Sequence, residues 1–238
     1  MNMVFDRLFG SGQHHITMDG NFIAGTATVG ERETVIIGTC NKAAIDCSLA
    51  LKVADAILQT IREDDEIKHS PRTILFLVDT QGQQLSRHEE LLGLNGYFAH
   101  VAGCCDLARR YDHRLVTVIH GEAVSGGFLA FGLMADRICA IPDAQVRVMD
   151  LRAMSKVTKI PYGKLVVLAE ESPVFAPGAE NYWRMGAVDE LWTIEDDWNR
   201  CLVSAINQAT TEDGRARLGL ERGGRAMAAP IAELVISA

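Results

Sequence analysis

Two glycine-containing turns, each between a predicted strand and a predicted helix, are the parts of this sequence that could do chemistry. The second turn follows the apolar run 115–119 and reads HGEAVSGG, ending in Gly126 and Gly127. Glycine lets a ligand approach the backbone closely, and a helix start leaves unpaired N–H groups that carry partial positive charge. Such a turn can hold an oxyanion or a phosphate, although glycines in a tight turn can equally serve packing alone.

The first turn has the same arrangement. The apolar run 73–78 suits a central parallel strand and stops at DTQGQ, so that Gly82 and Gln83 precede the next predicted helix. Two strands that each pass through a glycine turn into a helix indicate an α/β fold with a parallel sheet. The carboxyl ends of these strands are expected at one edge of the sheet, where ligands bind in such folds.

Periodicity predicts the elements around these turns. Short apolar runs predict further strands over 16–28, 33–40, 137–140, 145–149 and 187–192. Helical spacing predicts helices over 46–64 with Asp46 as N-cap, over 86–110 with a Ser86–Glu89 capping box, over 128–134 and over 195–209. We expect a loose N-terminal arm over 1–13, one domain over 14–238, and a loop-rich end with a short apolar segment over 231–236.

Composition narrows the possible functions. The 238 residues are 48% hydrophobic with a net charge of −8, which is typical of a folded globular protein and argues against nucleic-acid binding. No apolar run reaches the ~20 residues of a membrane span, and MNMVFDRLFGSG lacks the pattern of a secretory signal. The six scattered cysteines form no CxxC pair and the histidines lack ligand spacing, so we expect a reducing cytoplasm and no metal site.

Three segments resemble the crotonase/ClpP superfamily: FLVDTQGQ, the passage from HGEAVSGG to DAQVRVM, and YWRMGAVDELW. The D-T-x-G of residues 79–82, followed by the E-x-x-G of residues 90–93, is similar to the carboxyl-transferase branch. Within that branch, the chain length and the segment VTKIPYGKL resemble the malonate decarboxylase gamma-subunit family. The resemblance covers roughly residues 22–192 and implies a single-domain ββα spiral fold.

The resemblance also implies a reaction. It implies decarboxylation of a malonyl thioester on an acyl-carrier protein, giving the acetyl thioester and CO2 through an enolate. Two backbone N–H donors would stabilise the enolate oxygen, and losing one such donor typically costs about 2.7–4 kcal/mol. No cofactor is implied on this chain, since a CoA-like prosthetic arm on the carrier protein brings the substrate. The implied site lies between this chain and a homologous beta subunit, with catalytic residues Gly82, Gln83, Gly126 and Gly127.

Two other roles stay open at this point. By the same resemblance, the chain could be the carboxyl-transferase subunit of a biotin-dependent enzyme, which passes the carboxylate to biotin. It has no M-K-M sequence, so it is not itself the biotin carrier. It could also be a non-catalytic partner that only completes a site on the beta subunit, although two separate glycine turns at strand ends argue against that role.

Ser125, His120 and Glu122 are the predicted substrate-binding residues beside the turns. Ser125 stands where ClpP-type peptidases place a nucleophilic serine, but Met149 stands where we would expect their histidine. Without a base the serine is not activated, so we expect a small turn residue instead. A hydratase or isomerase would need a carboxylate here, for which Glu122, Glu89 and Glu90 are the candidates. Glu89 and Glu90 also suit a helix start, which is the role we favour.

The remaining candidates are basic side chains. His120 ends a strand at the ligand edge and could protonate the enolate, with a structural role as the alternative. His88 is a second candidate, for which we favour a surface role. Lys156, Lys159 and Lys164 could meet the phosphates of a CoA-like arm or an acidic carrier protein, and otherwise form a solvated face.

Overall fold

The computed structural model describes residues 1–67 and 70–237, and nine strands in these residues form one sheet. Three strands pair antiparallel at one edge: β1 (His14–Asp19), β2 (Phe22–Val29) and β3 (Arg32–Thr39). The others join in parallel: β4 (Ala43–Ile45), β5 (Thr73–Gln83), β6 (Leu115–Val124), β7 (Arg137–Ala140), β8 (Gln145–Arg147) and β9 (Glu190–Leu191). The main order is β1-β2-β3-β5-β6-β7-β9, which confirms the predicted α/β class with a mostly parallel sheet.

β5 and β6 are longer than predicted because each pairs twice. Their first halves lie in the main sheet, between β3 and β7. Their last residues turn to new partners: Gln83 of β5 pairs with Ile45 of β4, and Val124 of β6 pairs with Arg147 of β8. The predicted turn residues 82–83 are therefore still part of a strand, where β5 pairs with β4.

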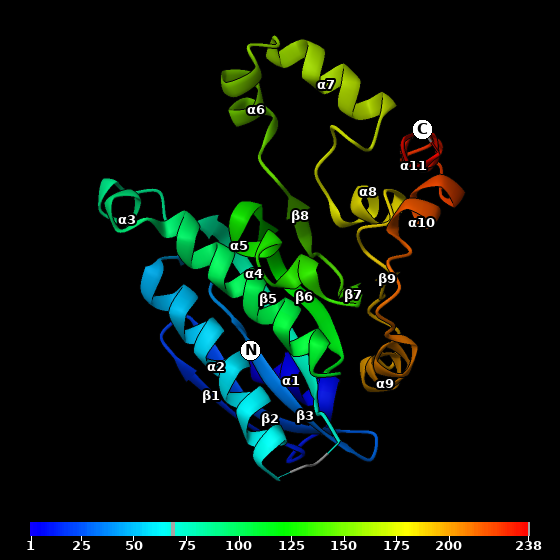
Figure 1. Cartoon of the computed structure of the whole chain (residues 1–238). Helices are drawn as coiled ribbons and strands as arrows, with labels where there is room; N and C mark the ends of the chain where they lie inside the picture. Colours follow the sequence, from blue (N-terminus) through cyan, green and yellow to red (C-terminus); the bar gives the residue numbers. More distant parts are fainter. Residues whose placement is uncertain (68–69, 238) are drawn as a thin grey trace.

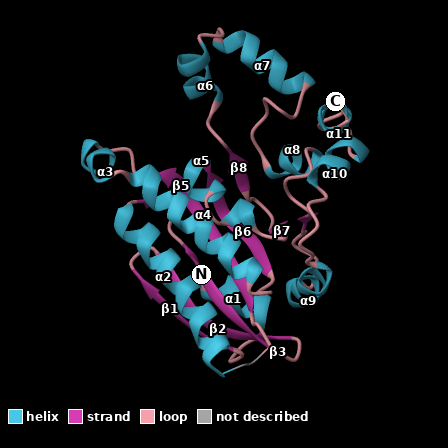
Figure 2. Cartoon of the chain, viewed as in Figure 1, coloured by secondary structure: helices cyan, strands magenta, loops and turns pink. Residues whose placement is uncertain are grey.

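Helices lie on both faces of the sheet, as Figures 1 and 2 show. One face carries α2 (Cys47–Ile67) and α4 (Leu94–Arg110), and the other carries α1 (Asn2–Phe9) and α9 (Trp198–Gln208). The remaining helices are α3 (Arg87–Leu92), α5 (Ser125–Leu129), the 3-10 helix η1 (Gly132–Met134), α6 (Leu151–Thr158), α7 (Tyr162–Glu171), α8 (Ala179–Arg184), α10 (Arg215–Glu221) and α11 (Ala228–Ile236). No helix among the described residues is long and apolar enough to cross a membrane.

The continuous apolar run of β5 follows from this three-layer arrangement. Phe76 and Val78 belong to the core beneath α2 and α4, whereas Leu75 and Leu77 belong to the core beneath α1 and α9. Both faces of the strand are therefore buried, which is why the sequence does not alternate between apolar and polar residues. This burial holds the end of β5, and with it the first glycine turn, in a fixed position.

Two of the predicted helices are interrupted. The helix expected over 86–110 divides at Gly93, which has a φ of 76° and ends α3 before α4 begins. The buried helix expected over 128–134 begins earlier, at Ser125, and gives way to the 3-10 helix η1. The prediction that a helix follows each glycine turn is confirmed. The helix predicted after the second turn was longer than the α-helix that the structure has there.

Residues 1–13 do not form the loose arm that the sequence analysis expects. Phe5, Leu8 and Phe9 lie on one face of α1 and are each at most 3% exposed. The guanidinium carbon of Arg7 lies 3.5 Å from the centre of a Trp198 ring on α9. The expectation of a loose arm is wrong. These three apolar residues are spaced to lie on one face of a helix, and that face packs into the core on the side of α9.

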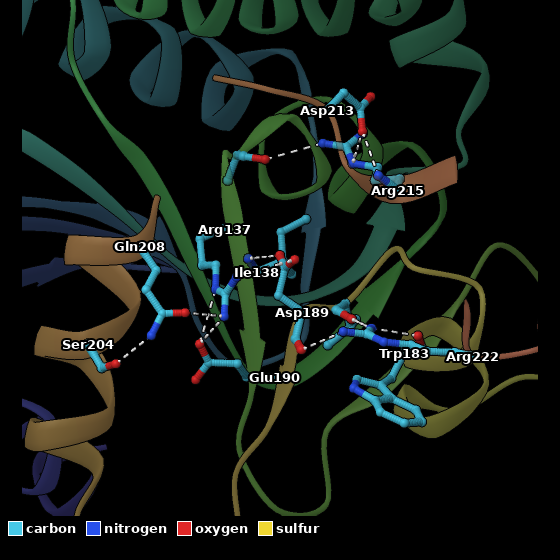
Figure 3. Close-up of polar contacts among 12 residues, drawn as sticks. Arg137, Ile138, Trp183, Asp189, Glu190, Ser204, Gln208, Asp213, Arg215 and Arg222 are labelled. Atoms are coloured by element: carbon cyan, nitrogen blue, oxygen red, sulfur yellow. Dashed lines mark hydrogen bonds and ion pairs between the residues drawn. The ribbon is translucent and has the colours of Figure 1, made fainter. Parts of the chain in front are cut away.

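The end of the chain is also more ordered than expected. The sequence predicts a loop-rich tail, whereas the structure has α10 and α11, and arginine contacts that are distant in sequence hold the tail (Figure 3). Arg215 donates to the carbonyl oxygen of Leu133 at 2.9 Å. Arg222 donates to the carbonyl oxygens of Trp183 and Val188, both at 2.8 Å. Pairings over such separations leave no local signal in the sequence.

The acidic pair of the GAVDELW segment fastens β9 to β7. Asp189 accepts a hydrogen bond from the backbone N–H of Ile138 at 2.8 Å, and Glu190 accepts from Arg137 at 2.7 Å (Figure 3). Burial raises the pKa of Asp189 despite that hydrogen bond and the nearby arginines. This segment therefore holds β9 at the edge of the sheet, and it also binds the tail, because Arg222 donates to the carbonyl oxygen of Asp189.

Candidate active site

The structure brings the two predicted glycine turns into direct contact. A Cβ atom placed on Gly127 would lie 3.0 Å from the Cα of Gly82 and 2.7 Å from Oγ1 of Thr80. A Cβ atom on Gly82 would lie 3.2 Å from Cβ of Ser125, and Gly82 has a φ of +102°, which favours glycine. The two backbones can approach this closely only because neither residue carries a side chain.

A side-chain amide joins the two turns. The backbone N–H of Gly126 donates to Oε1 of Gln83 at 3.3 Å. The N–H of Gly82 donates within its own turn, to Oγ1 of Thr80 at 3.0 Å. The amide oxygen of Gln83 therefore occupies the N–H of Gly126, and any other acceptor would have to displace it.

Ser125 occupies the sharp corner between β6 and α5. Its φ of 50° is unusual for a residue with a side chain. In the described part of the chain, no hydrogen bond joins its hydroxyl to a histidine; His113 and His120 instead bond the backbone carbonyls of Arg72 and Thr39. Among the described residues no base is hydrogen-bonded to this serine, so the geometry gives no support to a peptidase.

A buried carboxylate that the sequence analysis left without a role of its own, Asp79, positions the strands at the turns. Its Oδ1 accepts from the N–H of Glu122 and its Oδ2 from the N–H of Lys42, both at 2.9 Å. A Cβ on Gly121 would lie 2.3 Å from Oδ1, so glycine is required for this approach. Asp79 thus fixes β5, β6 and the β3–β4 loop together, and the D-T-x-G motif was the available signal.

Glu122 is held by two cations of its own chain. Nζ of Lys42 lies 3.0 Å from its Oε1, and Nη2 of Arg147 donates to its Oε2. Burial acts to raise the pKa of Glu122, but the hydrogen bonds and charges of Lys42 and Arg147 together lower it below its ordinary value. An ionised carboxylate held in this way is a poor proton acceptor, which counts against the hydratase alternative.

Glu89 serves a helix start, as the sequence analysis favoured, and it also serves a second helix. Its N–H donates to Oγ of Ser86 at 3.3 Å, the first half of the predicted capping box. Its Oε2 accepts from the N–H of Cys47 at 2.8 Å, at the beginning of α2. Hydrogen bonds from the Cys47 side chain and backbone lower the pKa of Glu89. Glu90 is exposed on α3.

Of the two candidate proton donors, one bonds a backbone carbonyl and the other lies on the surface. Nε2 of His120 lies 3.0 Å from the carbonyl oxygen of Thr39, so this ring links β6 to the end of β3. Burial lowers the pKa of His120, which favours its neutral form. His88 is exposed on α3. Lys156, Lys159 and Lys164 lie on helices α6 and α7 and the loop between them.

Comparisons with known proteins agree with one another on the family. A family model for the malonate decarboxylase gamma subunit matches residues 40–238. The malonyl-S-ACP:biotin-protein carboxyltransferase MADD of Malonomonas rubra is 32% identical over 229 residues, which cover 85% of this chain and 78% of MADD.

Solved structures share the fold. A Pseudomonas malonate decarboxylase hetero-tetramer in complex with coenzyme A contains a chain that matches at a TM-score of 0.83 and 22% identity, over 98% of this chain and 97% of that one. A chain of the Pseudomonas MdcD-MdcE hetero-dimer matches at 0.77 and 22%, over 98% and 96%. Transcarboxylase 12S matches at 0.69 and 20%, over 88% of this chain and 40% of that one. The predicted crotonase-type carboxyl-transferase fold is confirmed.

Proposed function

This chain belongs to the malonate decarboxylase gamma-subunit family, and we propose that it forms one side of the site that decarboxylates a malonyl thioester. The substrate is a malonyl group on an acyl-carrier protein; loss of CO2 leaves the enolate of the acetyl thioester, which takes up a proton on carbon to give the acetyl thioester. The Malonomonas relative bears a name that specifies a malonyl group carried in this way. A CoA-like prosthetic arm of the carrier protein supplies the thioester, and this chain binds no cofactor of its own.

The contact between the glycine turns is the observation that carries the proposed mechanism. When the bond to the carboxylate carbon breaks, its electron pair moves into the thioester and negative charge develops on the thioester oxygen. We assign Gly126 N–H as one donor to that oxygen, at the position that Oε1 of Gln83 now occupies. Once the Gln83 amide has moved aside, a donor held about 2.7–3.1 Å from the oxyanion stabilises it. Gly82 and Gly127 keep the two turns close enough to share this site.

The site is completed by a partner. We propose a homologous beta subunit that faces the glycine turns, as the family membership and the Pseudomonas hetero-dimer of the same fold suggest. Ser125 and Glu122 then line the approach to the turns rather than react, since Ser125 lacks a base and Glu122 is ion-paired. We place the complex in the cytoplasm, where the free cysteines of this chain would stay reduced.

The alternative function is transfer of the carboxylate to biotin. The Malonomonas relative favours it, because its name describes a biotin-protein carboxyltransferase and it is 32% identical to this chain. The two functions share the enolate and the glycine turns and differ in what receives the carboxylate. We favour direct decarboxylation because the gamma-subunit family model extends over residues 40–238.

Gly126→Val tests the site in the assembled complex. A Cβ at Gly126 would lie 3.2 Å from Oε1 of Gln83 and 3.4 Å from the ring of Phe98, so the larger side chain fills the space in front of the donor. Turnover should be lost while the complex still assembles. Gly103→Val is the matched control, because no atom lies within 4 Å of a Cβ there. Retained turnover in Gly126→Val would remove Gly126 from the site.

A further inference from the structure

Helices α6 and α7 form an arm that stands off from the sheet, at the top of Figure 1. No residue of α6 is buried in the described structure, and in α7 Leu165 is the buried residue. The two helices pack on each other, and Leu165 is fully buried. We call residues 151–171 the α6–α7 arm.

The α6–α7 arm carries a group of exposed cations that have no ion-pair partner among the residues that the structure describes. Arg152, Lys156, Lys159 and Lys164 are all exposed, and none forms an ion pair with any residue that the structure describes. The chain as a whole has a net charge of −8, so this concentration of positive charge is opposite in sign to the rest of the molecule. We call these four residues the basic tip.

The basic tip has a defined shape. Asp150 caps α6 by accepting from the N–H of Ala153 at 2.8 Å, and Lys159 ends the helix with a φ of 62°. Oγ of Ser155 donates to the carbonyl oxygen of Ile160 at 2.7 Å, which closes the turn between the two helices. The lysines are therefore presented by a closed turn with its own hydrogen bonds.

Exposed apolar groups lie among the lysines. Val157 is 68% exposed and Tyr162 is 45% exposed, with the guanidinium carbon of Arg152 lying 5.3 Å from the centre of the Tyr162 ring. A surface of this kind can bind an acidic protein, because charge steers the encounter while the apolar groups supply contact area. Nucleic acid is disfavoured as an occupant by the net charge of the chain.

The α6–α7 arm follows strand β8, which pairs with the end of β6 beside the second glycine turn. Strand β8 pairs with the last residues of β6, with Val124 opposite Arg147, and only residues 148–150 separate β8 from α6. At a rise of about 1.5 Å per residue, the eight residues of α6 place Lys159 roughly 12 Å along the helix axis from the first residue of α6. A partner on the tip would thus sit at a distance from the turns that a long prosthetic arm could bridge.

We propose that the basic tip is the docking surface for the acyl-carrier protein, meeting its acidic surface and the phosphate that joins the prosthetic arm to it. This inference rests on the proposed function and adds which part of this chain receives the substrate carrier. The malonyl thioester would then reach the glycine turns from the end of the arm, while the carrier protein stays outside the catalytic site.

The test is a charge reversal, Lys156→Glu/Lys159→Glu, in the complete complex with the beta subunit. Binding of a fluorescently labelled carrier protein, measured by anisotropy at low salt, should weaken by about tenfold or more. The kcat/KM for the malonyl carrier protein should fall similarly, whereas turnover of malonyl-pantetheine, which has neither phosphate nor protein, should stay unchanged. Raising the salt concentration should reduce the difference. Arg62→Glu/Arg200→Glu is the control, with the same charge change at two exposed arginines outside the arm.

Three results would overturn the docking proposal. The first is unchanged binding of the carrier protein to the charge-reversed complex. The second is an equal loss of turnover with malonyl-pantetheine and the carrier-bound substrate. The third is dissociation of the beta subunit from the variant, which would make the tip a subunit interface. If the wild-type complex decarboxylates no malonyl thioester, the proposed function fails, and the binding measurement still decides on the docking surface.

Discussion

Gly127→Ala should push the two glycine turns apart without removing any hydrogen-bonding group. The new Cβ would lie 2.7 Å from Oγ1 of Thr80 and 3.0 Å from Cα of Gly82, whereas ordinary van der Waals contact begins at 3.4 Å. Thr80 cannot rotate away without cost, because its hydroxyl donates to the carbonyl oxygen of Ala43 at 2.7 Å. The backbone of one turn must therefore move.

The expected loss has two parts. Forcing extra volume into a packed site typically costs about 1–3 kcal/mol of folding stability. Misplacing an oxyanion donor typically raises the barrier by about 2.7–4 kcal/mol, which lowers kcat by roughly 10²–10³-fold. We therefore expect a variant that still folds at 25 °C and still binds its partner, but that turns over malonyl thioester at less than about a hundredth of the wild-type rate.

The assay combines kcat for the malonyl thioester in the assembled complex with urea denaturation of the chain. Gly96→Ala is the matched control, because no atom lies within 4 Å of a Cβ there and the residue is inside α4. The control should keep wild-type turnover and gain about 0.5–1 kcal/mol of stability. A Gly127→Ala complex that keeps its full kcat would refute the idea that the contact between the turns is needed for catalysis.

Three further substitutions separate the roles of neighbouring residues. Ser125→Ala should keep most of the kcat, and a complete loss would reopen the case for a nucleophile. Asp79→Asn should lower the free energy of unfolding by about 1–3 kcal/mol in urea, because its NH2 group would face the N–H of Lys42 or Glu122. An unchanged free energy would contradict the role of Asp79 in holding β5, β6 and the β3–β4 loop together. Wild-type Glu122 contributes stability above its ordinary pKa of 4.5, lost as pH falls through its lowered folded pKa. Glu122→Gln should therefore be less stable at pH 7 and less acid-sensitive than wild type in thermal unfolding, and parallel pH profiles would argue against the ion pairs with Lys42 and Arg147.

The parts of the fold that local patterns specify could be predicted from the sequence. The apolar runs of β5 and β6 were identifiable because both faces of these strands are buried. Asp46 was identifiable as a cap, and it accepts from the N–H of Leu49 at 2.7 Å. The glycine turns were identifiable because parallel strands followed by helices place their ends at one sheet edge.

Features that depend on distant partners were missed. The order of α10 depends on Arg215, which reaches the carbonyl oxygen of Leu133, 82 residues away. The hydrogen bond from Gly126 to the Gln83 side chain spans 43 residues, and no sequence spacing announces it. The sequence analysis named Gln83 for its backbone position in the turn, and only the folded chain shows its amide oxygen in front of Gly126.

Decarboxylation by the purified chain, alone and mixed with its beta partner, tests the central claim most directly. The substrate is malonyl carrier protein, biotin and biotin carrier are absent, and released CO2 is measured. We predict release of CO2 in the mixture and none from the chain alone. Release that begins only when a biotin carrier is added would contradict direct decarboxylation and support carboxyl transfer instead.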